Sequence, residues 1–246
     1  MNRFQGKTIL ITGGTSGIGL AGAAKLADEG ADVIVTGRST EHLARAAEVL
    51  GDRAMVVNDD QLSPESPQRL ARVAREAGGL DGIWLNAGYA AASPIEDLTR
   101  SETESMFAVN TVAPMLQMGA LSPMVRSGGS VLVTSSTATY EGGKDLSLYS
   151  ATKAALLSSA RCWATELSPR NIRVNTLVPG PITSNLRTGL PAEIRSTFES
   201  ELADQVLLRR VGDAKEAAAF AAFLLSDDAS FVTGSSHYVD GGLLLH

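Results

Sequence analysis

Short, uninterrupted apolar runs alternate along the chain with longer stretches in which apolar residues recur at helical spacing. Runs that are apolar throughout are typical of strands buried on both faces, as in a parallel sheet. The repeated order of strand and helix predicts an α/β fold with a doubly wound, mostly parallel seven-stranded sheet and helices on both of its faces. The expected strands lie at residues 8–11, 33–35, 54–57, 83–85, 131–133, 174–178 and 238–239, and the expected helices at 17–29, 40–50, 64–77, 101–126, 150–168 and 213–226.

The chain is not divided by a repeat, a low-complexity tract or a linker rich in proline and serine, so we expect residues 1–246 to form one domain. One segment, residues 182–205, breaks the rhythm, because it is polar and lies between an expected strand and the last long helix. An insertion at the carboxyl end of a strand is where a lid over a bound ligand belongs. We expect a substrate lid there; a pair of ordinary surface helices is the alternative.

Composition narrows the range of partners. The formal net charge is −6 and no basic block occurs, which argues against nucleic acid or an anionic membrane as a partner. No apolar run approaches the ~18 residues of a membrane span, and the first residues lead into a strand rather than a signal peptide. With one cysteine, Cys162, the chain cannot form an internal disulfide, which favours the cytoplasm. The three histidines lack metal-ligand spacing, so no metal site is expected.

A glycine-rich turn at residues 12–19 lies between the first expected strand and the first expected helix. Glycines allow a tight turn and let a pyrophosphate approach the backbone, while the helix N-terminus offers amide donors and a positive dipole end. The sequence therefore predicts a dinucleotide site at this turn. Its predicted cofactor-binding residues are Gly13, Thr15, Ser16, Gly17, Ile18 and Gly19.

The end of the second expected strand indicates which dinucleotide is bound. An acidic residue there would hold the ribose 2′-hydroxyl of NAD, but this chain has Gly37, followed by Arg38 and Ser39. Gly37 carries no carboxylate, and the guanidinium of Arg38 suits a 2′-phosphate. We therefore expect NADP(H), with Arg38 and Ser39 among the cofactor-binding residues. The alternative is a solvated Arg38 in an NAD-dependent, alcohol-oxidising enzyme.

Tyr149 and Lys153 are four residues apart and share one face of an expected helix. An ammonium beside a phenol favours the phenolate, which shifts the phenol pKa from about 10 toward the range where proton transfer works best. Ser136, at the end of an expected strand, can offer a hydroxyl to the same oxygen; Ser135 is the alternative, but the spacing to Tyr149 favours Ser136. This trio predicts protonation or deprotonation of a carbonyl or alcohol oxygen.

The order of these and further motifs makes the chain resemble the short-chain dehydrogenase/reductase family over almost its whole length. The motifs are Thr-Gly-x-x-x-Gly-x-Gly at 12–19, Asn-Ala-Gly at 86–88, Asn110, the trio Ser136, Tyr149 and Lys153, Pro179-Gly180, and Val239-Asp-Gly-Gly242. The resemblance implies a Rossmann-type fold and a homotetramer assembled through the helix that carries Tyr149 and the last helix and strand. One departure is Leu85, where the family most often has asparagine.

The resemblance also implies roles for single residues. Tyr149 would be the general acid in reduction and the base in oxidation, Lys153 would lower its pKa and hold the nicotinamide ribose, and Ser136 would orient the substrate oxygen. Asn110 would bend its helix and hold a water of the proton relay. The implied cofactor contacts beyond the glycine-rich turn are Asp60 or its neighbour Asp59 at the adenine, Asn86, Ala87 and Gly88 along the cleft, and Pro179, Gly180, Ile182 and Thr183 at the nicotinamide.

Together these features predict an oxidoreductase that transfers a hydride between NADP(H) and a carbonyl/secondary alcohol pair, that is, a ketone or aldehyde reductase. A small-molecule substrate is expected, selected by the loops at residues 89–97, 137–148 and 182–205.

Two alternatives remain open. A reductase of 3-oxoacyl thioesters bound to a carrier protein would need a basic patch near the cleft, for which Arg126 and Arg170 are candidates. A nucleotide-sensing module without catalysis would have no need of the serine, tyrosine and lysine trio.

Overall fold

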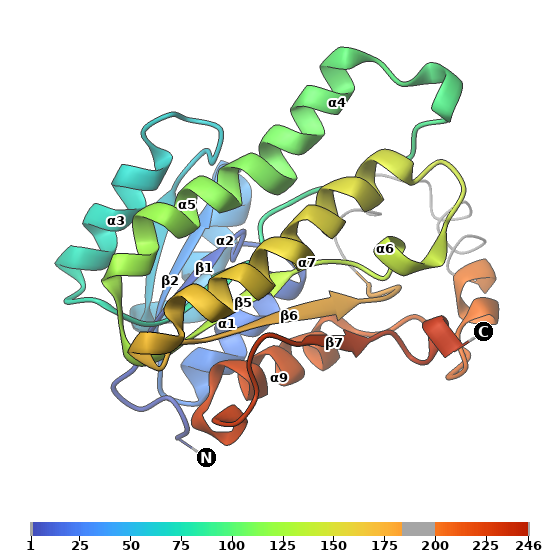
Figure 1. Ribbon diagram of the computed structural model, residues 1–246. Helices are drawn as coiled ribbons and strands as arrows, with labels where there is room; N and C mark the ends of the chain where they lie inside the picture. The colour runs from blue at the N-terminus through green and yellow to red at the C-terminus, as the bar shows by residue number, and fades with distance from the viewer. Residues whose placement is uncertain (1, 184–199, 246) are drawn as a thin grey trace.

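The computed structural model describes residues 2–183 and 200–245. Within these ranges, seven strands form one sheet in the order β3-β2-β1-β4-β5-β6-β7, and every neighbouring pair is parallel (Figure 1). The predicted doubly wound α/β fold is confirmed. The strands are β1 (Thr8–Thr12), β2 (Asp32–Gly37), β3 (Ala54–Asn58), β4 (Leu80–Leu85), β5 (Val125–Thr134), β6 (Arg173–Pro179) and β7 (Ser236–Val239).

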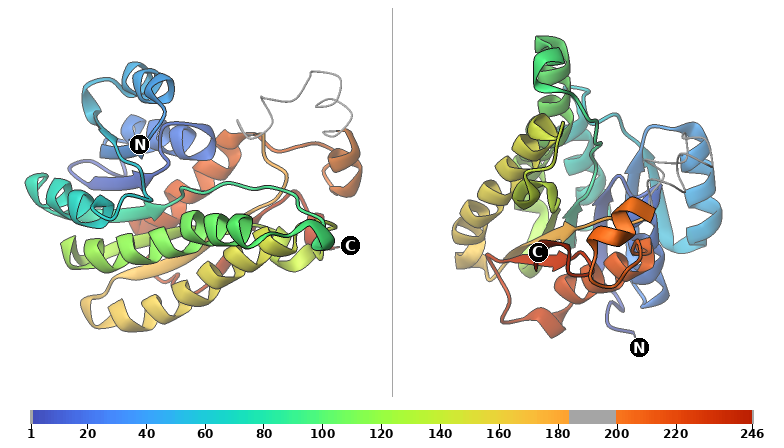
Figure 2. Two further views of the ribbon diagram at one scale, coloured as in Figure 1. Left: turned by 90° about the horizontal axis from the view of Figure 1, so that it is seen from above. Right: turned by 90° about the vertical axis from the view of Figure 1, so that its right-hand side faces the viewer.

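Helices cover both faces of this sheet (Figures 1 and 2). Residues of α1, α2 and α9 pack in the core on one face, and residues of α3, α5 and α7 in the core on the other. The helices are α1 (Gly17–Asp28), α2 (Thr40–Leu50), α3 (Ser66–Glu76), α4 (Arg100–Phe107), α5 (Ala113–Leu121), α6 (Ala138–Glu141), α7 (Ser147–Leu167) and α9 (Ala214–Leu225), and residues 200–205 are also helical. None of the described helices is long and apolar enough to cross a membrane.

Both faces of the central strands are buried, which explains their continuous hydrophobicity. In β1, Ile9 and Ile11 belong to the core on the α1 and α9 side, whereas Leu10 between them belongs to the core on the α5 and α7 side. Because successive side chains of a strand point to opposite faces, a strand between two helical layers needs apolar residues at every position.

The single helix predicted at residues 101–126 is wrong. The segment contains α4, then a π-helical turn, η3 (Ala108–Val112), then α5, and β5 begins already at Val125. Pro114 lies in the first turn of α5. Proline has no N–H to donate to the preceding turn, so an uninterrupted α-helix across this position would lose a hydrogen bond. The break lies at Asn110, the residue expected to bend its helix.

The sheet order reverses between β1 and β4, since the chain builds outward from β1 to β3 and then returns to add β4 on the other side. In open α/β sheets, ligands bind outside the carboxyl ends of the strands at such a reversal. The loops after β1, β2, β3, β4, β5 and β6 all leave from that edge. Of the lid expected at residues 182–205, residues 184–199 lie outside the described part of the chain.

Candidate active site

The turn after β1 is built so that only glycine fits at its closest contacts. Gly13 and Gly17 have φ angles of +64° and +52°, in the left-handed region that other residues rarely adopt. A Cβ on Gly13 would lie 2.8 Å from the Cα of Ala87, and one on Gly19 would lie 2.3 Å from the carbonyl oxygen of Gly13. The turn therefore presents bare backbone at the switch between β1 and β4.

The N-terminus of α1 is open toward this turn. Ser16 is the N-cap residue, its side chain makes no capping hydrogen bond, and the first turn of α1 has no acidic residue. The first amides of a helix need acceptors from outside the helix, and its dipole favours an anion. This end of α1 therefore suits a phosphate group. Thr15 is buried beside it, and Ile18 packs against the core below.

The end of β2 leaves little room for a side chain at position 37. A Cβ on Gly37 would lie 2.3 Å from Oγ1 and 3.1 Å from Cβ of Thr15, so a larger residue would require the Thr15 side chain, or the turn that carries it, to move. Arg38 follows on the surface and has no ion pair with any described residue. Ser39 caps α2, since its Oγ accepts from the backbone N–H of His42 at 3.4 Å. Arg38 is thus a cation without an ion-pair partner among the described residues. It follows the strand end at which NAD-binding and NADP-binding proteins carry different residues.

The two acidic candidates at the end of β3 have different environments. Asp59 is buried, accepts from the Ser66 hydroxyl at 2.7 Å, and lies 3.5 Å from the guanidinium of Arg69. Asp60 is exposed, and its carboxylate accepts from the backbone N–H of Leu62 at 3.0 Å. Asp59 is therefore engaged inside the chain, and Asp60 is the one that faces outward. The sequence alone had left the choice between them open.

The loop after β4 is fastened to the glycine-rich turn. Oγ1 of Thr12 accepts from the backbone N–H groups of Asn86, at 3.0 Å, and Ala87, at 3.2 Å. The Asn86 amide donates to the carbonyl of Gly13 at 3.3 Å. A Cβ on Gly88 would lie 3.0 Å from Oδ1 of Asn110 and 3.1 Å from Nζ of Lys153. Gly88 thus lets the loop pass closely over these two side chains.

Asn110 lies in the π-helical turn η3 and is fully buried. Its Oδ1 accepts from the backbone N–H of Tyr89 at 2.9 Å, and its Nδ2 donates to the Tyr89 carbonyl at 2.8 Å and to Oγ1 of Thr152 at 3.1 Å. The side chain therefore joins the loop after β4 to α7, the helix that carries Tyr149 and Lys153. Both ends of the Asn110 amide are bonded within the chain.

Lys153 holds its ammonium in a buried position. Its Nζ donates to the carbonyl of Thr134, the last residue of β5, at 3.0 Å. Burial lowers the pKa of Lys153 from 10.5 to about 8, because desolvation disfavours the charged form. Lys153 is therefore a fixed donor whose charge is easily lost.

Ser136, the serine favoured by the sequence, lies beside Tyr149, since a side-chain hydrogen bond with Ser136 lowers the pKa of Tyr149. The hydroxyl of Ser135 is used elsewhere, since it donates to the carbonyl of Lys153 at 3.1 Å. The pKa of Tyr149 is raised, first by burial and also by the negative charge of Glu141, while the hydrogen bond with Ser136 lowers it. This direction is opposite to the one expected from a nearby ammonium. The chain by itself therefore keeps Tyr149 protonated, as a proton donor must be.

The residues expected at the nicotinamide lie where β6 ends. Gly180 is held against β7, since its N–H donates to the carbonyl of Val239 at 3.0 Å and a Cβ on it would lie 2.7 Å from the Cα of Asp240. Thr183 is bonded to Gly212 through its backbone N–H, at 2.8 Å, and its hydroxyl, at 3.1 Å. Pro179 accepts from the N–H of Thr137, at 3.0 Å, and Ile182 is buried.

Comparison with known proteins agrees with this geometry. A family model described as enoyl-(acyl carrier protein) reductase matches residues 13–244. The oxidoreductase asL5 of Sarocladium schorii is 37% identical over 247 residues, which cover 99% of this chain and 98% of that protein. The chain belongs to the short-chain dehydrogenase/reductase family. It is an oxidoreductase of that family, whose members use a nicotinamide cofactor, NAD or NADP, and bind small-molecule substrates.

Two further proteins are similar to this short-chain dehydrogenase/reductase over almost their whole length. The glucose 1-dehydrogenase of Gluconobacter oxydans (strain 621H) is 32% identical over 256 residues, covering 100% of this chain and 94% of that protein. A solved structure described as a short-chain dehydrogenase/reductase, glucose/ribitol dehydrogenase from Brucella melitensis, has a TM-score of 0.92 and 30% identity, with 98% of each chain covered. The fold is thus close to that of solved family members.

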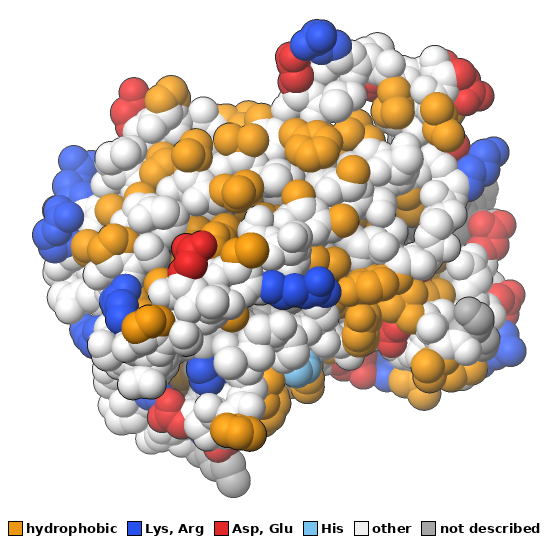
Figure 3. Space-filling model, in the orientation of Figure 1, with side chains coloured by type: hydrophobic (Ala, Val, Ile, Leu, Met, Phe, Trp, Pro, Cys, Tyr) orange, Lys and Arg blue, Asp and Glu red, His pale blue; other side chains and the backbone are white. Residues whose placement is uncertain are grey.

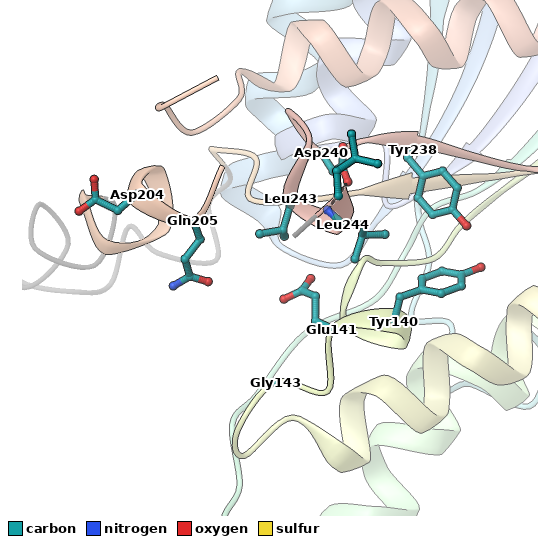
Figure 4. A pocket seen from close by; sticks show the side chains of 10 residues that line it. Tyr140, Glu141, Gly143, Asp204, Gln205, Tyr238, Asp240, Leu243 and Leu244 are labelled. Atoms are coloured by element: carbon teal, nitrogen blue, oxygen red, sulfur yellow. Dashed lines mark hydrogen bonds between the residues drawn. The ribbon is translucent and has the colours of Figure 1, made fainter. Parts of the chain in front are cut away.

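A cavity of about 750 Å³ is lined in part by Glu141, whose charge raises the pKa of the candidate residue Tyr149. Figure 4 shows Tyr140 and Glu141 of α6 on one side of it and Tyr238 and Leu244 on the other. The rings of Tyr140 and Tyr238 meet edge to face, with centroids 5.5 Å apart. The cavity lies partly against the expected substrate loop 137–148. Its lining consists of Tyr140, Glu141, Gly143, Asp204, Gln205, Tyr238, Asp240, Leu243, Leu244 and Leu245.

The candidates for a basic patch near the cleft are wrong. Arg126 pairs with Asp81 and donates to the carbonyl of Gly78 at 2.9 Å. Arg170 donates to the carbonyls of Ser122, at 2.8 Å, and Val125. These partners precede β4 and β5 or begin them, so both arginines lie at the amino edge of the sheet, opposite the site.

Sequence reasoning missed two residues that the structure places near the site. Glu141 acts on Tyr149 through its charge and lines the cavity. Gln61 bonds to the turn that carries Asn110. Neither residue belongs to a motif. The sequence gave an indication only for Glu141, which lies within the expected substrate loop 137–148. Among the described residues, no cluster of potential ligands suits a metal ion.

Proposed function

We propose that this protein transfers a hydride between NADP(H) and a carbonyl/secondary alcohol pair, with a ketone or aldehyde as the oxidised substrate. The observation that carries the proposal is the convergence of Ser136, Tyr149 and Lys153 at the carboxyl edge of the sheet, beside a glycine-rich turn that presents bare backbone. We further propose that the whole chain, 1–246, is one domain with a lid at residues 182–205.

The residues present fit a dinucleotide. Pyrophosphate would lie against the turn 12–19 and the open N-terminus of α1, where a side chain at Gly13 or Gly19 would collide with backbone. The adenine side would be held by Asp60. Arg38 would take a 2′-phosphate, because it is exposed, has no ion pair with any described residue, and follows Gly37, which carries no carboxylate. These features support NADP(H) over NAD(H).

When bound, the nicotinamide supplies or accepts the hydride. In reduction, Tyr149 would donate its proton to the carbonyl oxygen, and its raised pKa keeps that proton in place at neutral pH. Ser136, hydrogen-bonded to the same phenol, would orient the carbonyl oxygen. Lys153 would hold ribose hydroxyls while its ammonium is fixed on Thr134. It would replace the proton through a water held by the backbone at Asn110, because the side-chain amide of Asn110 is already bonded to Tyr89 and Thr152.

The first experiment is turnover of reduced nicotinamide, followed by its absorbance, with a panel of ketones and aldehydes and with NADPH and NADH in parallel. Tyr149→Phe should lose at least about a hundredfold in kcat, as expected when a general acid is removed, while its dissociation constant for NADPH stays near that of the parent. Tyr140→Phe, on the wall of the cavity, is the matched control. Equal activity in Tyr149→Phe and the parent would sink the assignment.

Carrier-bound thioester reduction is the second candidate, because the matching family model is described as an enoyl-(acyl carrier protein) reductase. The arginines at the opposite edge give it no docking patch. A preference for the carrier-bound thioester over the free one that disappears at high salt would favour this candidate. Nucleotide binding without any turnover, and no change on Tyr149→Phe, would favour a sensing module.

We also propose a cytoplasmic homotetramer. Val112, Met115 and Leu116 are exposed apolar residues of η3 and α5, and Phe231 beyond α9 is fully exposed. Apolar side chains gather over the α5 and α7 face in Figure 3. Exposed apolar clusters on a folded chain commonly mark subunit contacts.

A further inference from the structure

The turn after β3 reaches across to the turn that carries Asn110. Gln61 lies in the former, and its Nε2 donates to the carbonyl oxygen of Val109 at 3.3 Å. Val109 directly precedes Asn110. A carbonyl only accepts hydrogen bonds, so the Gln61 amide must present its NH2 group to it, which fixes the orientation of the amide. Its Oε1 is buried and has no partner among the described residues.

The carbonyl of Val109 needs a donor from a side chain because the helix cannot supply one. In the π-helical turn, the N–H of Ala113 donates to the carbonyl of Ala108, five residues back. The corresponding donor for Val109 would be residue 114, which is Pro114 and has no N–H. Val109 is half-buried, and a backbone carbonyl that is partly withdrawn from water is less favourable unpaired than paired. Gln61 therefore replaces the donor that proline removes.

A second connection joins the same two regions. The Ser66 hydroxyl donates to the carboxylate of Asp59 at 2.7 Å and accepts from Nε2 of Gln117 on α5 at 3.3 Å. All three side chains are buried. The turn after β3 is thus bonded to the start of the π-helical turn through Gln61 and to α5 through Ser66. Two polar connections, a buried one at Ser66 and a part-buried one at Gln61, restrain the segment better than one.

We propose that Gln61 is a positioning residue, which fixes the backbone at Asn110 from the turn that would hold the adenine. The catalytic part of this inference rests on the proposed function, since Asn110 acts only if the protein transfers protons to a carbonyl oxygen. The structural part stands without it. Adenine binding and the geometry of Asn110 are thereby linked through one side chain.

Gln61→Met tests this link in the full-length protein, because methionine has a similar length and no N–H. We expect kcat to fall about tenfold, as small displacements of a catalytic group can cost this much or more, with little change in KM for the carbonyl. Gln68→Met, at an exposed position of α3, is the control and should keep the parent kcat. In an Asn110→Ala background, Gln61→Met should cause no further loss. Parent-like kcat, or losses that multiply, would overturn the proposal.

Hydrogen exchange gives a readout that does not depend on activity. The amides of residues 107–116 should exchange several-fold faster in Gln61→Met than in the parent, and at the parent rate in Gln68→Met. Equal exchange in all three proteins would overturn the proposal. Faster exchange in a protein that turns over no carbonyl would keep Gln61 as the residue that fixes the turn and reject the proposed function instead.

Discussion

Lys153 is the residue whose chemistry depends most on being buried. Its pKa is lowered from 10.5 to about 8. Between these two values the unfolded chain binds more protons than the folded chain, so the free energy of unfolding rises with pH in this window. The cost of burying the ammonium is fully present below a pH of about 8 and disappears as the pH approaches 10.5.

Lys153→Met should remove this pH dependence. The stability of the parent relative to the variant should increase by about 2 kcal/mol between pH ~7 and ~9.5. Chemical unfolding of both proteins at the two pH values measures it. The pKa of Tyr149 is raised, so its own titration falls above this window. Parallel pH profiles for the two proteins would contradict a buried, weakly basic lysine.

Arg38 carries a separate prediction on the cofactor. Arg38→Ala should raise the dissociation constant of NADPH about tenfold or more, because a charge-assisted contact with the 2′-phosphate is lost, and leave that of NADH unchanged. Titration of both nucleotides by fluorescence checks this. Arg45→Ala, on the neighbouring helix α2, serves as the control. An equal effect on both nucleotides would point to general electrostatics.

Single residues show what the sequence could and could not predict. Ser136, Tyr149 and Lys153 could be predicted as a candidate site because their spacing follows from strand and helix geometry. The contacts of Asp59 and Gln61 could not be predicted, because their partners are distant in the sequence. Asp59 lies beside Arg69, and Gln61 bonds to Val109. Contacts of that kind are set by the packing of helices onto the sheet and leave no local pattern.

Among the elements, the broken helix that carries Asn110 differs most from expectation. No glycine or proline lies between Arg100 and Ala113, so the sequence indicates one helix, and the backbone is right-handed helical on both sides of the π-helical turn. Pro114 was the local signal against it, but proline is common in a first helical turn and does not itself locate the break. The sheet was predictable because each buried strand has its own apolar run.

Pro114→Ala should make Gln61 less important. Alanine at this position supplies an N–H that can bond to the carbonyl of Val109 in place of the Gln61 amide. We expect Gln61→Met to lose less kcat in the Pro114→Ala background than in the parent, by several-fold. Steady-state kinetics of the four proteins measure the coupling. An undiminished loss in the Pro114→Ala background would show that proline is not the reason for the contact.

At the scale of the whole molecule, the number of subunits can be tested by measuring the mass in solution. Leu116→Glu places a charge among the exposed apolar residues of α5 and should lower the mass in solution from that of the proposed tetramer to that of a smaller species. Light scattering after gel filtration measures it. Arg100→Glu, an exposed charge reversal on α4, should leave the mass unchanged. A parent protein that runs as a monomer would reject the tetramer outright.

The contact between Gly37 and Thr15 has an evolutionary consequence. A carboxylate that favours NAD would enter at position 37, but its Cβ would meet Oγ1 of Thr15 at 2.3 Å. Gly37→Asp alone should therefore damage the glycine-rich turn, and Thr15→Gly alone should only loosen it. The same substitution at position 37 is harmful or useful depending on residue 15. On the proposed preference for NADP(H), a change to NAD(H) through position 37 would therefore need a change at position 15 as well.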